Sequence, residues 1–219
     1  MKLLKKEKLT HDVYELVFYC DKNLETLPGQ FITFILPSGL RRAYSISNKD
    51  GNNLEFIVKR LEDGRGGSRE LCDIEIGTLV ESIGPVGHFI LRENDNNKLF
   101  VGTGTGFAPL YFQVKKALES GLKSKMLFIF GVRGFEDVFY EKQLNFLKNK
   151  YTNFDFELFL SREDHTRTSR GYVTDYLKIG NIGDFDEFYI CGSTVMVECS
   201  KQKIEEAGFK KEQIYFEKY

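Results

Sequence analysis

Short apolar stretches separated by turn residues fill the first part of the chain. The candidate strands are Lys2–Lys8, Val13–Tyr19, Gln30–Leu36, Ala43–Ile46, Leu54–Val58 and Leu79–Ile83. Between them lie the segments DKN, LPGQ, PSG, NKDGNN and EDGRGGS, whose residue types favour turns and loops. Because the strands follow one another at short spacing, we expect antiparallel pairing. The pattern predicts a small β-barrel or sandwich over residues 1–95, and we favour the barrel.

The pattern changes after the polar stretch Glu93–Lys98, which is the best linker candidate. Apolar strands are then expected at Leu99–Val101, Met126–Phe130, Phe154–Leu160, Phe188–Cys191 and Gln213–Phe216. They alternate with helical segments at Pro109–Ser120, Glu141–Asn149, Val173–Ile179 and Val195–Ala207. Such alternation is typical of a parallel sheet covered by helices on both faces. We therefore predict two domains, a barrel followed by an α/β domain over residues 98–219.

Composition narrows the class of protein. With 42% hydrophobic and 29% charged residues the chain is typical of a soluble globular protein, and a net charge of −1 gives no reason to expect nucleic acid or an anionic membrane as partner. No apolar run is long enough to cross a bilayer, and MKLLKKEKLTHD lacks a signal-peptide core, so we expect a cytoplasmic protein. The 4 cysteines form no CxxC pair, which argues against zinc or an iron–sulfur cluster and favours reduced thiols.

A glycine-rich segment, GTGTGFAP at Gly102–Pro109, follows a predicted strand and opens a predicted helix. Glycines let the backbone approach a phosphate, and the start of a helix favours an anion. However, Phe107 stands where the GxGxxG pattern has its third glycine, and Arg133 stands where an acidic residue would hold a ribose diol. The segment is consistent with a dinucleotide site, with a simple tight turn, or with another nucleotide fold such as a methyltransferase.

Two further segments are candidate anion sites. In RRAYS, at Arg41–Ser45, strand alternation puts Arg42 and Tyr44 on one face and Ser45 on the other. An arginine fork suits a pyrophosphate and a tyrosine ring can cover a flat heterocycle, although a basic turn entering a strand would look the same. GRGGS, at Gly64–Ser68, offers backbone N–H groups and a hydroxyl, or is simply a flexible hairpin loop.

Two strand ends in the second half also carry polar chemistry. Cys191 ends one strand, where ligands of open α/β sheets bind, although a buried cysteine is often only a small hydrophobe. Ser161 and Arg162 end another strand, with Arg167 and Arg170 nearby. These residues could bind a ribose phosphate or form a solvated charged loop.

Taken together, the segments resemble the ferredoxin–NADP⁺ reductase family over nearly the whole chain. The resemblance is carried, in the family's order, by RAYS, VKRLEDGRGGS, GPVG at Gly84–Gly87, GTGTGFAP, the CG at Cys191 and the terminal E-x-Y at Glu217–Tyr219. It implies a two-domain flavoenzyme without an iron–sulfur domain, in which the barrel holds a flavin and the α/β domain holds NAD(P).

The resemblance also implies roles for residues of the first half. Arg42 and Ser68, with the backbone of Gly66 and Gly67, would bind the flavin pyrophosphate. Tyr44 would cover one face of the isoalloxazine, and Ser45 would lie near flavin N5. Val58 and Lys59 would line the ribityl side.

In the second half, Cys191 and Gly192 would lie near the nicotinamide. Glu217 would hydrogen-bond to Ser45, and Tyr219 would stack on the free face of the flavin until it swings aside for the coenzyme. The coenzyme phosphates and ribose would contact Thr103, Gly104, Thr105, Arg133, Ser161 and Arg162. Of these residues, Ser45, Cys191, Glu217 and Tyr219 are the expected catalytic group.

The implied reaction is hydride transfer between NAD(P)H and the flavin, with electrons passed to or from ferredoxin, flavodoxin or a similar soluble carrier. GPVG favours FAD, whereas GRGGS is also compatible with FMN. The Ser161–Arg162–Glu163 run favours NADPH over NADH. One alternative is the reductase component or subunit of a multi-protein oxygenase or electron-transfer complex. Another is a flavin-binding sensor without turnover.

Overall fold

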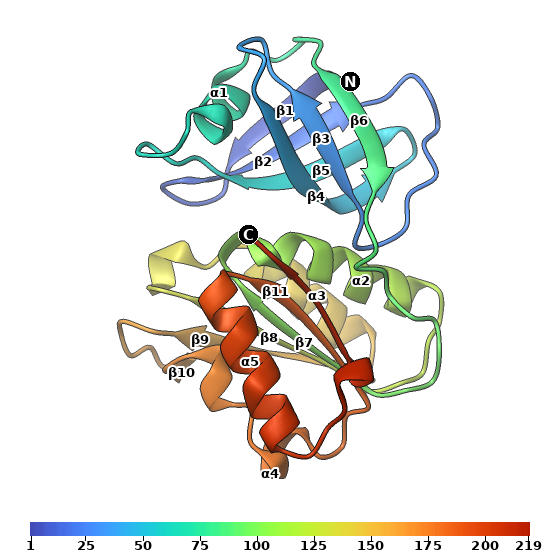
Figure 1. Ribbon diagram of the computed structural model, residues 1–219, viewed down its shortest axis with the longest axis vertical. Helices are drawn as coiled ribbons and strands as arrows, with labels where there is room; N and C mark the ends of the chain where they lie inside the picture. Colours follow the sequence, from blue (N-terminus) through green and yellow to red (C-terminus); the bar gives the residue numbers. More distant parts are fainter.

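The first half of the chain folds into six antiparallel strands. The computed structural model describes residues 1–219. The strands are β1 (Lys2–Lys8), β2 (Val13–Tyr19), β3 (Phe31–Ile35), β4 (Arg41–Asp50), β5 (Asn53–Lys59) and β6 (Glu81–Val86), paired in the order β1-β2-β5-β4-β3-β6. Main-chain bonds around Lys2 and Leu79 bring the segment before β6 against β1 and close the sheet into a barrel. The predicted barrel is confirmed (Figure 1).

Alternation along these strands fills the barrel with Phe-rich packing. Phe18, Phe34 and Phe56 are fully buried, and their rings contact one another with centroids 4.8 to 5.9 Å apart. A short helix, α1 (Gly67–Asp73), covers one end of the barrel between β5 and β6. Because alternate side chains of β4 and β5 point into this core, the side chains between them face out of the barrel.

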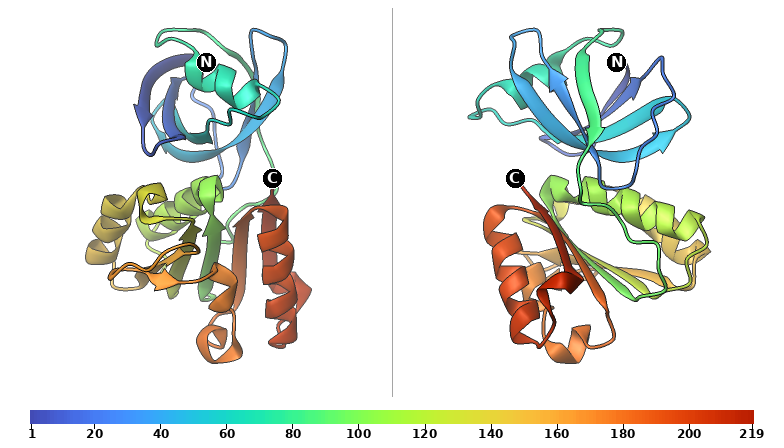
Figure 2. Two further views of the ribbon diagram at one scale, coloured as in Figure 1. Left: turned by 90° about the vertical axis from the view of Figure 1, so that its left-hand side faces the viewer. Right: turned by 45° about the vertical axis from the view of Figure 1, so that its right-hand side comes forward.

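The second half is the predicted parallel α/β domain. Its strands are β7 (Lys98–Thr103), β8 (Met126–Val132), β9 (Phe154–Leu160), β10 (Ser169–Arg170), β11 (Glu187–Gly192) and β12 (Ile214–Lys218), in the order β10-β9-β8-β7-β11-β12. The helices are α2 (Phe107–Glu119), α3 (Glu141–Lys150), α4 (Ile179–Ile182) and α5 (Thr194–Glu206). One core lies between the sheet and α2 and α3, and another lies between the sheet and α4 and α5, so the sheet is covered on both faces (Figure 2).

Most predicted elements agree with the structure to within a few residues, but one helix was wrong. Instead of a helix over Val173–Ile179, a single 3₁₀ turn spans Val173–Asp175, and α4 begins only at Ile179. Val173 and Leu177 are buried in the core, so the apolar residues of the predicted helix do face the interior. Lys178 is extended between the two turns, which interrupts a continuous helix.

The polar linker candidate Glu93–Lys98 is also more ordered than its sequence indicated. Lys98 belongs to β7 and is 0% exposed. Its ammonium donates to Asn94 O, Asn94 Oδ1 and Asn96 O at 2.9, 2.7 and 2.7 Å and lies 3.7 Å from Glu187 Oε2. Glu187 in turn accepts from both asparagine amides. The linker is therefore folded around a buried ion pair at the start of β11.

The barrel sits on α2 and on the carboxyl ends of the parallel strands (Figure 1). Val13 and Ile57 of the barrel pack into the same core as Phe107 and Tyr111 of α2. Lys115 of α2 donates to Asn48 of β4 at 2.8 Å. The chain's C-terminus lies at this junction (Figure 2). No helix of the structure combines the length and apolar character needed to span a membrane.

Candidate active site

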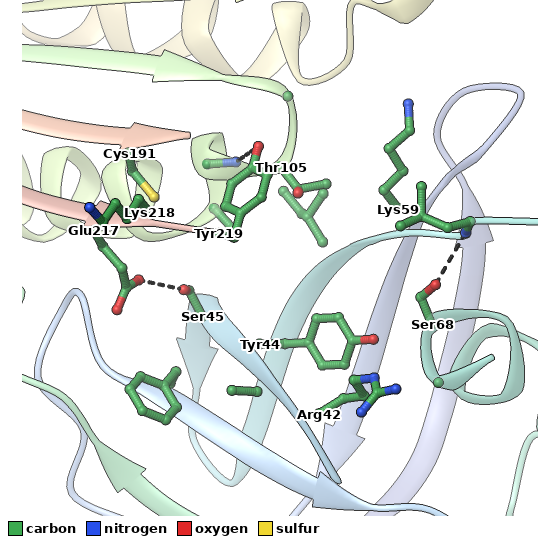
Figure 3. Close-up of a pocket in the computed structure, with 18 of the residues that line it drawn as sticks. Arg42, Tyr44, Ser45, Lys59, Ser68, Thr105, Cys191, Glu217, Lys218 and Tyr219 are labelled. Carbon is green, nitrogen blue, oxygen red and sulfur yellow. Dashed lines mark hydrogen bonds between the residues drawn. The ribbon is translucent and has the colours of Figure 1, made fainter. Parts of the chain in front are cut away.

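A cavity of about 560 Å³ lies between the barrel and the second domain. Its walls come from segments far apart in the sequence: β3 and β4, the loop after β5, α1, the glycine-rich turn, and the ends of β11 and β12. We call it the first cavity. Figure 3 shows the labelled side chains that border it, which are Arg42, Tyr44, Ser45, Lys59, Ser68, Thr105, Cys191, Glu217, Lys218 and Tyr219.

One end of the first cavity carries an unpaired arginine. Arg42 donates only to two main-chain carbonyls, Arg41 O at 2.7 Å and Arg65 O at 3.3 Å, and forms no ion pair. A Cβ on Gly67 would lie 2.5 Å from Arg42 Nε, so any larger residue would displace the Arg42 side chain from its place over the start of α1. Gly66, with φ 84°, makes the preceding turn. This corner has the charge and open backbone expected of a pyrophosphate site.

Ser68 supports the same corner by fixing its loop. Its Oγ accepts a hydrogen bond from Leu61 N at 3.1 Å, and both residues line the first cavity (Figure 3). Lys59 lines the cavity too, and its ammonium lies 2.7 Å from Asp12 Oδ2. The family resemblance implied that Val58 lines the flavin site, but Val58 does not line this cavity. Its side chain is fully buried in the barrel core, because it points to the opposite face of β5 from Lys59.

Tyr44 and Ser45 both border the first cavity although they are consecutive on β4. Tyr44 points toward the Arg42 end, whereas Ser45 points across the junction to β12 (Figure 3). Alternation separates the two side-chain directions as predicted, but the cavity spans both of them. Tyr44 rests against the barrel core, and this burial raises its pKa well above the usual value.

Ser45 makes a direct contact between the two domains. Its hydroxyl donates to Glu217 Oε2 at 3.0 Å, which is the hydrogen bond that the resemblance implied. Burial raises the pKa of the Glu217 carboxyl, and the bond from Ser45 lowers it in part. The pair therefore holds a carboxyl with an elevated proton affinity beside the cavity.

Cys191 lies next to Glu217 because their strands are paired. In the parallel register of β11 and β12, Cys191 is opposite Glu217. The thiol is only 2% exposed, and burial, together with the nearby Glu217 charge, raises its pKa well above the usual value. Cys191 is thus a neutral thiol at neutral pH and not a nucleophilic thiolate.

Tyr219 is held against the glycine-rich turn. Its hydroxyl donates to Thr103 O at 2.9 Å and accepts from Gly106 N at 3.3 Å, the second of which is drawn in Figure 3. A Cβ on Gly106 would lie 2.3 Å from Cys191 O, so the turn approaches β11 closely. The Tyr219 hydroxyl is therefore hydrogen-bonded to the Gly106 N–H, which is the kind of main-chain donor that glycine-rich turns offer to phosphates.

A second cavity, of about 620 Å³, lies over the carboxyl ends of the parallel strands. The predicted residues Thr103, Gly104, Thr105, Arg133 and Ser161 line it. The two cavities share four lining residues, which are Lys59, Gly104, Thr105 and Tyr219. They are therefore adjoining spaces with Tyr219 at their boundary.

Besides Val58, three predicted residues stand apart from the cavity walls. Arg162 is exposed and is not among the residues that line the second cavity. Gly66 shapes the Arg42 corner without lining it. A Cβ on Gly192 would lie 2.2 Å from Thr103 Oγ1, so this glycine lets β11 end close against β7.

Sequence reasoning missed several residues of the second cavity. Tyr172 lines it and is 66% exposed, and Val195 lines it and is 81% exposed. Asp12 reaches it from the barrel and holds Lys59. These residues lie on loops or at a helix start, outside any recognisable motif. The only signal for these residues in the sequence was the aromatic side chain of Tyr172 directly after Gly171.

The arrangement fits the two cofactors that the motifs suggested. The unpaired Arg42, the glycine backbone beside it and the Tyr44 ring suit a flavin with a pyrophosphate. The glycine-rich turn and Arg133 suit a second phosphate-bearing nucleotide. Fold and site thus define the class as a two-domain protein with one cavity suited to a flavin and a second suited to a nucleotide coenzyme.

Comparisons with known proteins give the family. Residues 1–90 match an oxidoreductase FAD-binding domain and residues 100–202 match an oxidoreductase NAD-binding domain. A ferredoxin–NADP reductase B from Sorangium cellulosum is 31% identical over 206 residues, covering 87% of this chain and 84% of that protein. The chain belongs to the ferredoxin reductase-like family, whose FAD and NAD(P) domains it contains.

Two more relatives extend the comparison. The toluate 1,2-dioxygenase electron transfer component of Pseudomonas putida is 33% identical over 201 residues, covering 90% of this chain but 59% of that protein. The chain spans 59% to 65% of the length of three dioxygenase-system components that it resembles. The crystal structure of a cytochrome P450 reductase from Amycolatopsis superposes with a TM-score of 0.92 at 27% identity, covering 99% of this chain and 68% of that one.

Proposed function

We propose that the protein transfers a hydride between NAD(P)H and a bound FAD and exchanges electrons with a separate redox carrier. The observation that carries the proposal is the meeting of two adjoining cavities at Tyr219, with Cys191 and the Ser45–Glu217 pair beside the first. FAD, when bound, supplies the conversion between two-electron and one-electron chemistry. The residues bind, orient and shield the reactants.

The first cavity is proposed to hold FAD. Arg42, with the backbone of Gly66 and Gly67 and the Ser68 hydroxyl, would bind the pyrophosphate, and Tyr44 would lie against the ring system. The free charge of Arg42 and its approach to Gly67 support this assignment. The fully buried Val58 side chain leaves only main-chain atoms at that position to contact a cofactor.

Ser45, Glu217 and Cys191 are proposed as the groups closest to the reacting atoms. The hydrogen bond between Ser45 and Glu217 keeps the hydroxyl oriented at the junction and gives it a carboxyl partner with which to exchange a proton. The neutral Cys191 thiol adds no charge to the site. It would pack against the nicotinamide as a small, polarisable wall.

The second cavity is proposed to hold the coenzyme, with Tyr219 as its gate. Thr103, Gly104 and Thr105 would bind the phosphates, and Tyr172 would stack on the adenine. The Tyr219 hydroxyl accepts the hydrogen bond of Gly106 N, and the side chain lies at the boundary of both cavities. Tyr219 therefore has to move before the coenzyme can reach the flavin.

NADPH is proposed as the preferred coenzyme. Arg133 lines the second cavity and is exposed to it, which gives a 2′-phosphate a positive partner. Ser161 lines the same cavity, and Arg162 follows it on the exposed loop. The protein is proposed to work in the cytoplasm, where its four free cysteines would stay reduced.

The proposed acceptor is a soluble carrier such as ferredoxin or flavodoxin. The similarity to a ferredoxin–NADP reductase supports it. A second candidate, the reductase component of a multi-protein oxygenase or electron-transfer complex, is favoured by the 33% identity to a dioxygenase electron transfer component. In either case the electrons leave this chain for another protein.

An anaerobic titration tests the proposed function. Purified protein is loaded with FAD, and flavin absorbance is followed as NADPH or NADH is added. We expect one FAD per chain and loss of flavin absorbance, with NADPH acting at lower concentration than NADH. A protein that takes up no flavin refutes the proposal. Preferential bleaching by NADH would refute the coenzyme preference alone.

A further inference from the structure

Tyr140 has the most unusual backbone conformation in the chain. It is the only residue other than glycine with positive φ, at 60°, and it directly precedes α3. A bulky side chain in this region is uncommon and energetically unfavourable. Tyr140 is nevertheless buried, with 8% of its surface exposed. Its surroundings must therefore hold it in place.

The barrel provides the main contact. The Tyr140 hydroxyl donates a hydrogen bond to Glu15 Oε1 on β2. Glu15 is itself 9% exposed, and its other oxygen accepts from Lys5 Nζ at 3.1 Å. Burial and the Glu15 charge raise the pKa of Tyr140 far above the usual value, so the phenol remains a donor. A buried, charge-assisted bond thus crosses the domain interface.

A second contact joins the same two segments. His11, in the hairpin between β1 and β2, places Nδ1 3.5 Å from Asp137 Oδ1. The other oxygen of Asp137 accepts from Gly134 N at 3.1 Å. One barrel hairpin with its following strand therefore contacts the segment Gly134–Tyr140 at two points.

This segment is also a wall of the second cavity. Asp137 and Phe139 line that cavity, as does Arg133 just before them. The Tyr140 ring meets Phe107 and Tyr111 edge to face, at 5.5 and 5.1 Å between centroids. Phe107 begins α2 directly after the glycine-rich turn. The position of Tyr140 is thus linked to both sides of the cavity.

We propose that Tyr140 is a positioning residue: by holding Glu15, it fixes the wall of the second cavity relative to the flavin barrel. A coenzyme bound there would then meet the flavin in register, although neither Tyr140 nor Glu15 lines the first or the second cavity. This inference rests on the proposed function, because it assigns the second cavity to the coenzyme.

The test uses the FAD-loaded full chain and the variant Tyr140→Phe, which removes the hydroxyl and keeps the ring. The matched control is Tyr111→Phe, since the neighbouring Tyr111 hydroxyl makes no hydrogen bond. Oxidised coenzyme is titrated without turnover, KM and kcat are measured with an artificial acceptor, and thermal unfolding is recorded. We expect Tyr140→Phe to weaken coenzyme binding and raise KM about 5- to 10-fold, within the usual range of coupling between sites, with kcat and FAD content little changed. Tyr111→Phe should match the wild type.

Glu15→Gln provides a second, independent variant. Its amide carbonyl can still accept from the phenol, so the effect on KM should be smaller, and combining it with Tyr140→Phe should add little to Tyr140→Phe alone. If Tyr140→Phe fails to fold, Glu15→Ala, which removes the acceptor of the Tyr140 hydroxyl altogether, decides, and unchanged coenzyme binding in Glu15→Ala overturns the inference. A lowered unfolding temperature with wild-type coenzyme affinity would likewise show a purely structural role. A wild-type protein that binds FAD but no coenzyme would instead refute the proposed function.

Discussion

Replacing Ser45 by alanine removes a single interaction at the place where the two cavities meet. The Ser45 hydroxyl donates to Glu217 at 3.0 Å across the domain junction. Neither side chain makes another hydrogen bond within the protein. The substitution therefore leaves Glu217 half-buried with no partner from the protein, and it creates almost no cavity because only one oxygen atom is lost.

The size of the effect follows from that geometry. A hydrogen bond to a charged group contributes about 1.5–3 kcal/mol. Because Glu217 is only partly buried, water can replace some of the lost interaction, which places the loss at the lower end of this range. We assign this loss to the barrier for hydride transfer, because Ser45 is proposed to act beside the reacting atoms, and each 1.4 kcal/mol of that barrier corresponds to a factor of about ten in rate. We expect Ser45→Ala to slow flavin reduction about tenfold.

The assay is anaerobic mixing of FAD-loaded protein with saturating NADPH, with the loss of flavin absorbance followed in time. Ser47→Ala is a matched control, since Ser47 lies on the same strand and its buried hydroxyl has no hydrogen-bond partner. The control should reduce at the wild-type rate. Equal rates for Ser45→Ala and Ser47→Ala would refute the role given to the Ser45–Glu217 pair.

The pH dependence provides an additional check on the same variant. Burial raises the pKa of Glu217 and the Ser45 bond lowers it, so losing that bond raises the pKa further. The part of the pH–rate profile that reports Glu217 protonation should therefore move to higher pH in Ser45→Ala. A shift to lower pH would contradict the assignment.

Three other predictions test separate parts of the account. Arg42→Leu should weaken FAD binding about 10- to 100-fold, as expected for the loss of charge-assisted hydrogen bonds, and should spare coenzyme binding; flavin titration measures the former, and an unchanged FAD affinity would exclude this anchor. Lys98→Met should lower the free energy of unfolding by about 3–5 kcal/mol, because it leaves Glu187 buried without its cation; urea unfolding at wild-type stability would contradict this. Iodoacetamide should label the half-buried Cys20 and Cys199 before Cys191, whose raised pKa keeps its thiol protonated; mass spectrometry showing early labelling of Cys191 would contradict its assignment as a neutral thiol.

Strand patterns predicted the fold well where burial alternates or is continuous. Lys2–Lys8, Val13–Tyr19 and Phe154–Leu160 begin and end as expected. The prediction of a helix over Val173–Ile179 was wrong because its apolar residues reach the core from turns. Lys98 could not be recognised as buried, since its partners are polar residues of its own linker and Glu187 on a strand that follows much later in the chain.

The site residues also differ in how far the sequence predicts them. Motif residues such as Arg42, Ser45 and Cys191 were identifiable because each belongs to a short local motif, RAYS or CG, and the structure brings them to one cavity. Tyr172 lies on a loop whose path depends on tertiary packing. Tyr140 and Glu15 meet only when the two domains dock. Spacing along one strand or helix carries no information about such contacts.

The central claim is that hydride passes directly between a coenzyme in the second cavity and FAD in the first. The most direct measurement compares the rate of flavin reduction with NADPH carrying hydrogen or deuterium at the transferred C4 position, under anaerobic single-turnover conditions. The account predicts rapid loss of flavin absorbance that is slower with deuterium. A protein that binds FAD, yet whose flavin absorbance changes with neither NADPH nor NADH, would contradict it.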